Sequence, residues 1–362
     1  MTSPLSPDAP LDIRVARSDA MTRTALVFWA VLVAGLAAAP FWGDRQTLRL
    51  LTEIYSYLAL ASLWNLLAGY AGLVSIGQQA FVGVGGYCLY LCALRLGLNP
   101  LFGVPVAGVV GGLFAVPVIL LLQRLRGAYF TIGSWVVAEI LIQAVQQIPS
   151  VGGGSGISLP ATVVKAIATT RDGREFSIYW IFLILVVAVI GAIIVLLRSR
   201  YGLALTAIRD NEEAAKSNGI DVYATRMVAF IVAGVATATV GSMIFLQKLN
   251  ITPFSAFSMN DWTVNVIFIT VIGGIGRVEG PLFGTVIYFL LREYLADLAS
   301  AYLIILGVVA IAIMIKAPSG LWGYFADRYG WHLFPLARRL ILTTPRVGSE
   351  RAGAEPAAAA RG

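Results

Sequence analysis

Long apolar runs alternate with short polar stretches along almost the whole chain. Each run is close to the roughly 20 residues that an α-helix needs to cross a bilayer core. The segment 261–276 is the shortest of them, and both a full span and a re-entrant segment stay open for it. The runs predict about ten spans, at residues 24–42, 50–68, 73–94, 101–122, 128–148, 178–197, 226–247, 261–276, 280–299 and 302–317.

The composition supports a surface that faces lipid. Of 362 residues, 58% are hydrophobic and 12% are charged, whereas a soluble domain carries roughly 25% charged residues. The runs lack the strand-like alternation of an outer-membrane barrel. The sequence therefore predicts an all-α, polytopic helical bundle with about ten transmembrane helices.

The basic residues predict the orientation of this bundle. With the N-terminus inside, 18 of the 26 Lys and Arg residues fall in inside segments and seven fall outside, while Arg292 lies within a span. Cytoplasmic segments are enriched in Lys and Arg. We therefore expect both termini in the cytoplasm and an even number of spans.

Polar segments divide the chain further. Residues 1–23 and 326–362 are expected to be largely disordered cytoplasmic tails around a transmembrane domain at 24–325. The loop 149–177 is expected on the periplasmic side, and it opens with glycines between Gly152 and Gly156. These glycines fit a flexible connector or a close approach of backbone to a partner or solute, and both interpretations stay open.

Several kinds of chemistry are absent from the sequence. Cys88 and Cys92 lie in one span, where helix packing explains them better than a disulfide or a metal site. The single histidine, His332, leaves no His-based metal site or catalytic triad within the chain. No phosphate-binding G-x-x-x-x-G-K-[ST] loop occurs. The net charge of +7 is spread over loops and tails, which fits membrane orientation and no nucleic-acid site.

The most hydrophilic internal segment is 198–226, which carries five basic residues between two apolar runs. It predicts an amphipathic helix over 203–217, with Leu203, Ala207 and Ala214 on one side and with Gly219 as its stop. Such a helix fits a groove of a cytoplasmic protein or an interfacial position on lipid, and the sequence favours neither.

The segment also carries a family motif. Glu213-Ala214-Ala215 followed by Gly219 resembles the core of the EAA-x-x-x-G motif of ABC importer permeases, although the Ile-x-Leu-Pro ending of its longer form is missing. Further stretches resemble the LivM-type permeases of branched-chain amino acid importers and the related urea-type permeases, over about residues 50–325. They are NLLAGYAGLVSIGQQAFVGVGGY at 65–87, LRGAYFTIG at 125–133, GGGSGISLP at 152–160, SRYGLALTAIRDNEEAAKSNGI at 199–220, VIGGIGRVEGPLFG at 271–284 and APSGLWG at 317–323.

The resemblance implies a function and partners. It implies a non-enzymatic permease in a bacterial inner membrane that imports branched-chain or other hydrophobic amino acids, with urea, short amides or aromatic acids as alternatives. Expected partners are a LivH-type permease, two LivG/LivF-type subunits that bind ATP and Mg²⁺, a periplasmic binding protein and lipid. Gln78 stands where many members carry histidine, so the solute preference can differ. ATPase coupling is expected from Arg209, Glu212, Glu213, Ala214, Ala215 and Gly219.

Polar residues within the spans suggest two further sites. Glu139, Gln143 and Gln146 form one helical stripe, which fits an internal strut, the translocation path or the junction with a second permease. The candidate path residues are Ser75, Gln78, Gln79, Glu139 and Gln143. The candidate gate or cytoplasmic loop holds Gly274, Gly276, Arg277 and Glu279.

One alternative function comes from a different class. A secondary transporter or channel works without an ATPase and uses buried charges as coupling sites, for which Glu139 is the strongest candidate. A membrane-embedded enzyme requires clustered catalytic groups at one depth, and the sequence shows none.

Overall fold

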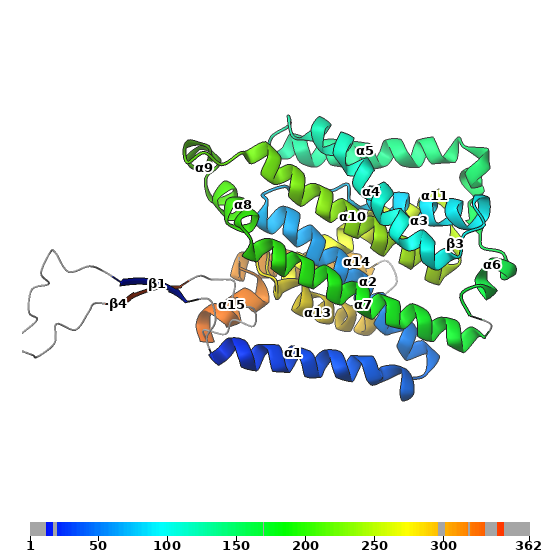
Figure 1. The fold of residues 1–362 in the computed structure, drawn as a ribbon, viewed down its shortest axis with the longest axis horizontal. Helices are drawn as coiled ribbons and strands as arrows, with labels where there is room; N and C mark the ends of the chain where they lie inside the picture. The colour runs from blue at the N-terminus through cyan, green and yellow to red at the C-terminus, as the bar shows by residue number, and fades with distance from the viewer. Residues whose placement is uncertain are drawn as a thin grey trace, which may run out of the picture.

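The computed structural model describes residues 12–16, 20–168, 170–295, 301–317, 319–329 and 339–343. Its long helices run side by side along one direction and form a single bundle (Figure 1). They are α1 (Ala20–Ala38), α2 (Arg45–Asn65), α3 (Gln78–Arg95), α4 (Pro100–Leu122), α5 (Ala128–Gln146), α7 (Arg171–Arg198), α10 (Val222–Lys248), α12 (Asn265–Gly273), α13 (Gly280–Tyr294) and α14 (Ala301–Lys316).

Short elements join or extend these helices. The helical ones are η1 (Ala39–Phe41), η2 (Leu66–Tyr70), η3 (Pro149–Val151), η4 (Gly153–Ser155), α6 (Ala161–Lys165), α8 (Arg200–Asp210), α9 (Glu212–Ser217), α11 (Pro253–Ala256), η5 (Asn260–Val264) and α15 (Gly320–Tyr329). Two strand pairs complete the fold: β1 (Asp12–Ala16) with β4 (Arg339–Thr343), and β2 (Ile157–Ser158) with β3 (Asn250–Ile251).

Each predicted span overlaps one of the long helices. Within the described residues, six helices are long and apolar enough to cross a membrane. They are Arg45–Tyr70, Pro100–Leu122, Ala128–Gln146, Arg171–Arg198, Val222–Lys248 and Ile304–Ala326. An all-α, multi-span bundle is therefore confirmed, whereas the number ten and the sides of the termini stay predictions.

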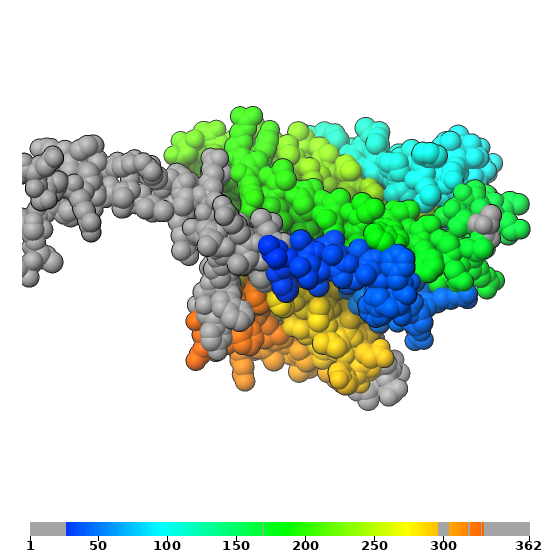
Figure 2. All heavy atoms as spheres, turned by 60° about the horizontal axis from the view of Figure 1, so that its bottom comes forward, coloured from blue at the N-terminus to red at the C-terminus, as the bar shows by residue number. Residues whose placement is uncertain are grey.

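The helices differ in how far the bundle encloses them. The most apolar stretch of the α2–η2 helix is 78% buried and that of α10 is 67% buried, so these two helices form the centre. The corresponding value for α5 is only 17%. Figure 2 shows α1, in blue, on the surface between α7 in green and α13 in yellow. Exposed apolar faces on the outer helices fit contact with lipid.

Glycines allow α10 to approach α3 and α4 closely. A Cβ atom on Gly85 of α3 would overlap the carbonyl oxygen of Ala238, and one on Gly111 of α4 would overlap the Ala238 side chain. The pair Gly108 and Gly112 faces Thr239 and Val235 of α10 in the same way. Small residues at helix interfaces in membranes permit this backbone approach, so the GxxxG pair serves helix packing.

The loop predicted at 149–177 is shorter and more ordered than expected. Helix α7 already begins at Arg171, because Thr170 caps it by accepting a hydrogen bond from the amide of Gly173 at 3.1 Å. Residues 157–158 pair with β3, and a Cβ atom on Gly156 would overlap the Ile251 carbonyl oxygen. Gly156 therefore brings backbone against β3, which agrees with a close approach of backbone and not with a flexible connector at this position.

Both predicted tails contain ordered elements. Helix α1 begins at Ala20 and α15 extends to Tyr329, so the bundle reaches past the predicted boundaries at residues 23 and 326. Within the predicted tails, β1 and β4 form an antiparallel pair. Their sequences, DIRVA and RLILT, contain the β-branched residues that favour strands. The remainder of both tails, including His332, lies outside the described residues.

Candidate functional site

The segment 198–226 forms an arm of two short helices at one end of the bundle, with α15 at the same end and α6 at the other (Figure 1). The corner between α7 and α8 is tight, because a Cβ atom on Gly202 would overlap the Leu197 carbonyl oxygen. Ser199 caps α8, with its Oγ accepting a hydrogen bond from the amide of Tyr201 at 3.1 Å. The arm therefore leaves the bundle at a fixed angle.

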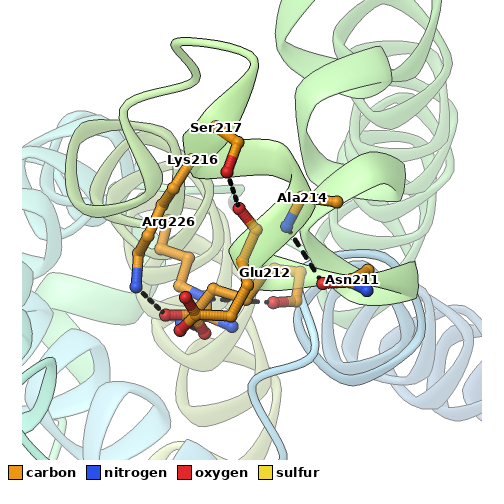
Figure 3. Close-up of polar contacts among 8 residues, drawn as sticks. Asn211, Glu212, Ala214, Lys216, Ser217 and Arg226 are labelled. Carbon is orange, nitrogen blue, oxygen red and sulfur yellow. Dashed lines mark hydrogen bonds and ion pairs between the residues drawn. The ribbon is translucent and has the colours of Figure 1, made fainter.

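A single amphipathic helix over 203–217 was predicted, and this prediction is wrong. Asn211 has extended backbone angles (φ −159°, ψ 105°) and separates α8 from α9. Its Oδ1 accepts a hydrogen bond from the amide of Ala214 at 3.0 Å (Figure 3). An asparagine at the N-cap position accepts hydrogen bonds from the free amides at the start of a helix. Asn211 therefore ends α8 and caps the start of α9.

The break also changes which side of the arm is apolar. Leu203 and Ala214, which were predicted on one side of a single helix, are both exposed, whereas Leu205 and Ile208 are buried. Ala215 is buried with Ile208 and Val222 in a small apolar cluster. The exposed side of α9 consists of Glu213, Ala214, Ser217 and Asn218, and we call it the α9 outer face.

Helix α9 ends at the predicted glycine. Gly219 has φ +80°, which only glycine adopts freely. Its amide donates to the Lys216 carbonyl at 2.9 Å, and the amide of Ile220 donates to the Ala215 carbonyl at 3.1 Å. This pair of hydrogen bonds is the Schellman motif of helix ends. Gly219 is thus confirmed as the helix stop.

Glu212 faces the bundle from the inner side of α9. Figure 3 shows its carboxylate near Lys216 and Arg226. Its Oε1 lies 2.7 Å from Lys216 Nζ and its Oε2 lies 3.0 Å from Arg226 Nη1. The hydrogen bond from Lys216 lowers the pKa of Glu212 below its ordinary value, and the positive charge of Arg226 adds to this effect. Glu212 and Glu213, adjacent in the motif, therefore have different surroundings.

Two arginines fasten the arm to the turn that ends α2. Arg209 Nη1 donates to the Gly69 carbonyl at 3.0 Å, and Arg226 Nε donates to the Ala71 carbonyl at 3.3 Å. Gly69 lies in η2, a single turn of π-helix, and Ala71 directly follows it. We call residues 66–72 the α2 turn. Because both contacts reach this one turn, a displacement of the arm acts on the end of the most buried helix.

The predicted gate loop also contacts the α2 turn. The Asn65 side chain donates to the Arg277 carbonyl at 2.7 Å and accepts from the Gly276 amide at 2.8 Å. A Cβ atom on Gly69 would lie 2.5 Å from the Gly276 nitrogen. The structure therefore brings two separately predicted sets together, the arm with Arg209 and the loop with Gly276 and Arg277.

The other two loop residues have their own surroundings. Gly274 is buried with φ +129°, and a Cβ atom on it would lie 2.7 Å from the Ser319 carbonyl oxygen before α15. Glu279 is 7% exposed. The loop is consequently packed between the α2 turn and the start of α15, and a side chain at Gly274 would overlap the Ser319 carbonyl oxygen.

Sequence reasoning assigned no role to Asn65 and Ala71, which complete this junction. Asn65 was detectable as an amide at the end of an apolar run, where a polar side chain requires a partner. Ala71 contributes only a backbone carbonyl. No side-chain pattern reveals a contact of that kind.

The predicted path residues fall into two separate groups. Ser75, Gln78 and Gln79 are buried between α2 and η5. The Ser75 carbonyl accepts from Trp64 Nε1 at 2.8 Å, Gln78 Nε2 donates to the Leu60 carbonyl at 2.9 Å, and Gln79 Oε1 accepts from the Thr263 hydroxyl. Gln78 Oε1 and Gln79 Nε2 have no partner among the described residues.

Glu139 and Gln143 lie elsewhere, on the exposed side of α5. The carboxylate of Glu139 accepts a hydrogen bond from Trp135 Nε1 at 3.0 Å. The interpretation of this stripe as an internal strut is therefore wrong, because α5 is a peripheral helix. A path or a subunit junction along α5 stays a prediction.

Six apolar spans and a polar arm fastened to their central helix define a multi-pass membrane protein. The family described as "Branched-chain amino acid transport system / permease component" matches residues 46–317, and the chain belongs to this family. Among the described residues, no cluster of three His, Cys, Asp or Glu side chains could hold a metal ion.

Individual relatives agree with the family. The chain is 27% identical to the high-affinity branched-chain amino acid transport system permease protein LivM of Escherichia coli, over 84% of this chain and 76% of that protein. It is 24% identical to the probable branched-chain amino acid transport permease protein LivH of Methanocaldococcus jannaschii, over 75% of this chain and 90% of that protein. No solved structure matches the chain.

Proposed function

We propose that this chain is a membrane-spanning subunit of an ATP-driven importer of branched-chain or other hydrophobic amino acids. In this proposal, the arm and both termini lie in the cytoplasm of a bacterium. A LivH-type permease, two LivG/LivF-type ATP-binding subunits with ATP and Mg²⁺, and a periplasmic binding protein complete the system. Membership of the permease family supports the proposal, as do relatives named LivM and LivH.

One observation carries the role of the arm. Its inner side is fixed to the bundle through Arg209, Glu212 and Arg226, whereas the α9 outer face has no contact of that kind within the described residues. A partner that grips the outer face therefore moves the α2 turn and, through Asn65, the gate loop. This is the mechanical link that alternating access requires of a subunit without its own ATPase.

The alternatives are less well supported. Urea, short amides or aromatic acids stay alternative solutes, because a separate binding protein can determine selectivity. A secondary transporter or channel requires a buried ionisable coupling group. Its strongest candidate, Glu139, is exposed on α5 and bound to Trp135, so the geometry favours the ATP-driven function.

A charge reversal on the α9 outer face tests the proposal. Glu213→Lys introduces a cation into the surface that the ATP-binding subunit would contact, and like-charge or mismatched contacts cost several kcal/mol. We expect ATP-dependent leucine uptake into proteoliposomes to fall by about tenfold or more, with a normal yield of this chain. Lys165→Glu, an exposed reversal on α6 at the other end, is the matched control and keeps its uptake.

Two results would contradict this role. Uptake that is unchanged in Glu213→Lys would remove the outer face from the coupling contact. Labelling of a cysteine at position 213 from the periplasmic side would place the arm where no cytoplasmic ATPase reaches it.

A further inference from the structure

A large open groove lies at the end of the bundle opposite the arm. Its volume is about 1330 Å³. Most of its walls come from the first half of α2, the end of α10, η5 and α13, and Arg174 of α7 and Asn265 of α12 complete the lining. Strand β3 begins at Asn250, directly after α10, which places the groove at the end that holds α6 and β3 (Figure 1). We call it the α2–α13 groove.

The floor of the groove is aromatic. Tyr57 and Trp262 are 6% and 3% exposed, and their ring centroids lie 6.1 Å apart. Phe289 packs edge-on against Tyr57 with a centroid distance of 5.8 Å. Leu50 and Val286, both exposed, line the same groove. Together these side chains form a surface that suits an apolar group of a ligand.

Charged side chains of both signs stand around this floor. Lys248 Nζ lies 4.7 Å from the centroid of the Trp262 ring, and Asp261 directly precedes Trp262 in the chain. Both side chains are exposed in the groove. Arg292 Nη1 forms an ion pair of 2.7 Å with Glu53 Oε1. Ionisable groups in membrane helices are costly, and a functional role is their most common explanation.

The balance of these charges selects the kind of occupant. Four basic and three acidic side chains line the groove, so it suits neither a polyanion nor a polycation. A small molecule with one carboxylate, one ammonium and an apolar side chain uses all three features at once. The groove therefore fits an α-amino acid with a hydrophobic side chain better than it fits urea or a simple amide, which carry no charge.

We propose that the α2–α13 groove is a binding site for the zwitterionic solute on the side away from the arm. This inference rests on the proposed transport function and adds a location within this one chain. Lys248 binds the carboxylate of the solute and Asp261 binds its ammonium group, while the aromatic floor contacts its side chain. The Glu53–Arg292 pair holds α2 and α13 at the width that the site requires.

Protection of an introduced cysteine tests the site without measuring transport. The full chain, with its co-purifying subunits in nanodiscs, carries Cys88→Ala, Cys92→Ala and Val286→Cys and reacts with a water-soluble maleimide. L-Leucine is expected to slow labelling at position 286 about tenfold. At equal concentration, 4-methylpentanoate and 3-methylbutylamine, which each lack one charge, protect little. A cysteine at position 165 on α6 is the control, and leucine leaves its rate unchanged.

Two single substitutions give an independent measurement. Lys248→Gln and Asp261→Asn each remove one charge at an exposed position, so both chains are expected to fold. Each is expected to raise the KM for leucine uptake about tenfold with little change in maximal rate, because the loss of one charge-assisted hydrogen bond weakens binding by that factor.

The results separate this inference from the proposed function. If leucine uptake requires ATP but leucine leaves position 286 unprotected and both KM values unchanged, the groove proposal is overturned and the transport function stands. Protection by both single-charge analogues would also overturn it, because it would show only an apolar or lipid-filled groove. If uptake proceeds without ATP while leucine protects position 286, the ATP-driven function fails and the site stands.

Discussion

The two ends of the bundle differ in whether their polar side chains are enclosed by protein or open to solvent. At the arm end, Arg209, Arg226 and Asn65 each bond to backbone atoms, and a side chain on Gly69 has no space. At the other end, charged side chains stand around an open groove of about 1330 Å³. A closely packed, hydrogen-bonded junction transmits a displacement from one element to the next. An open groove with charged walls lets a dissolved ligand bind and leave.

This difference divides the proposed work between the ends. A rigid junction has two discrete arrangements rather than a continuous range, because packed interiors deform little. The α2 turn can therefore act as a switch point between the arm and the gate loop. Substitutions at the junction should damage stability and coupling together, whereas substitutions at exposed polar positions should change function and leave the fold intact.

Gly69→Ala is expected to have the largest effect on the fold. The new Cβ would lie 2.5 Å from both the Gly276 nitrogen and Asn65 Oδ1. Overpacking of this kind costs about 1–3 kcal/mol, and we expect the upper part of that range because one neighbour is backbone. Thermal unfolding in detergent measures the effect. Gly191→Ala, a helical glycine of α7 with nothing within 4 Å, is the control and should be neutral.

Equal melting temperatures for the two glycine variants would contradict the tight junction. They would show that the α2 turn and the gate loop yield to a methyl group. The comparison between a closed and an open end would then lose its physical basis.

Asn65→Ala is expected to be the next most damaging substitution. It removes both hydrogen bonds to the gate loop, to the Arg277 carbonyl and from the Gly276 amide. A buried backbone group left without a partner costs about 1–3 kcal/mol. We expect a destabilisation of about 2 kcal/mol and a loss of solute-dependent ATP hydrolysis in the assembled complex. Asn250→Ala, at an exposed asparagine of β3, should show neither change.

Much of the architecture could be predicted from the sequence because it depends on local periodicity. Apolar runs locate the long helices, and Gly219 marks a helix end because its backbone angles exclude most side chains. The break at Asn211 was missed because the helical pattern continues through it. One capping hydrogen bond of Asn211 decides whether the segment forms one helix or two. The spacing of apolar residues does not reveal the conformation of a single residue.

The junction and the groove depend on distant contacts, which one sequence does not show. Asn65 and Gly276 lie 211 residues apart, and Arg209 and Gly69 lie 140 apart. The groove combines residues from six separate helical segments, α2, α7, α10, η5, α12 and α13. Sequence reasoning noticed Arg292 within a span but could not find its partner Glu53, 239 residues away. The sequence shows the charge of Arg292 and the residues of the arm and the gate loop. Which residues contact one another can be seen only in the folded structure.

Glu212→Gln is expected to have a smaller effect that depends on pH. The pKa of Glu212 is lowered from its ordinary value of 4.5, so its stabilising contribution is fully present above that pH and is lost as the pH falls through the lowered value. Hydrogen exchange of the α9 amides is expected to be about twofold to threefold faster in the variant at pH 7. At a pH below the lowered pKa, the two proteins should exchange alike.

Glu213→Gln is the matched control for this measurement. Glu213 is exposed beside Glu212, and its substitution should leave exchange in α9 unchanged at both pH values. Faster exchange in Glu213→Gln than in Glu212→Gln would show that the inner side of α9 does not hold the arm.

Glu139→Gln is expected to have the smallest effect on stability and tests the exposed side of α5. The substitution keeps an acceptor for Trp135 Nε1 at an exposed position, so the melting temperature should change by less than the equivalent of about 0.5 kcal/mol. If α5 forms the junction with a second permease or borders the path, co-purification or uptake should nevertheless fall.

The control for Glu139→Gln must change an exposed polar residue away from α5. Gln123→Glu, in the loop after α4, is unsuitable because Gln123 Oε1 is buried. Lys165→Gln on α6 is suitable, since it changes one exposed charge away from α5. Normal assembly and uptake in Glu139→Gln would show that the Glu139 carboxylate on α5 serves neither role.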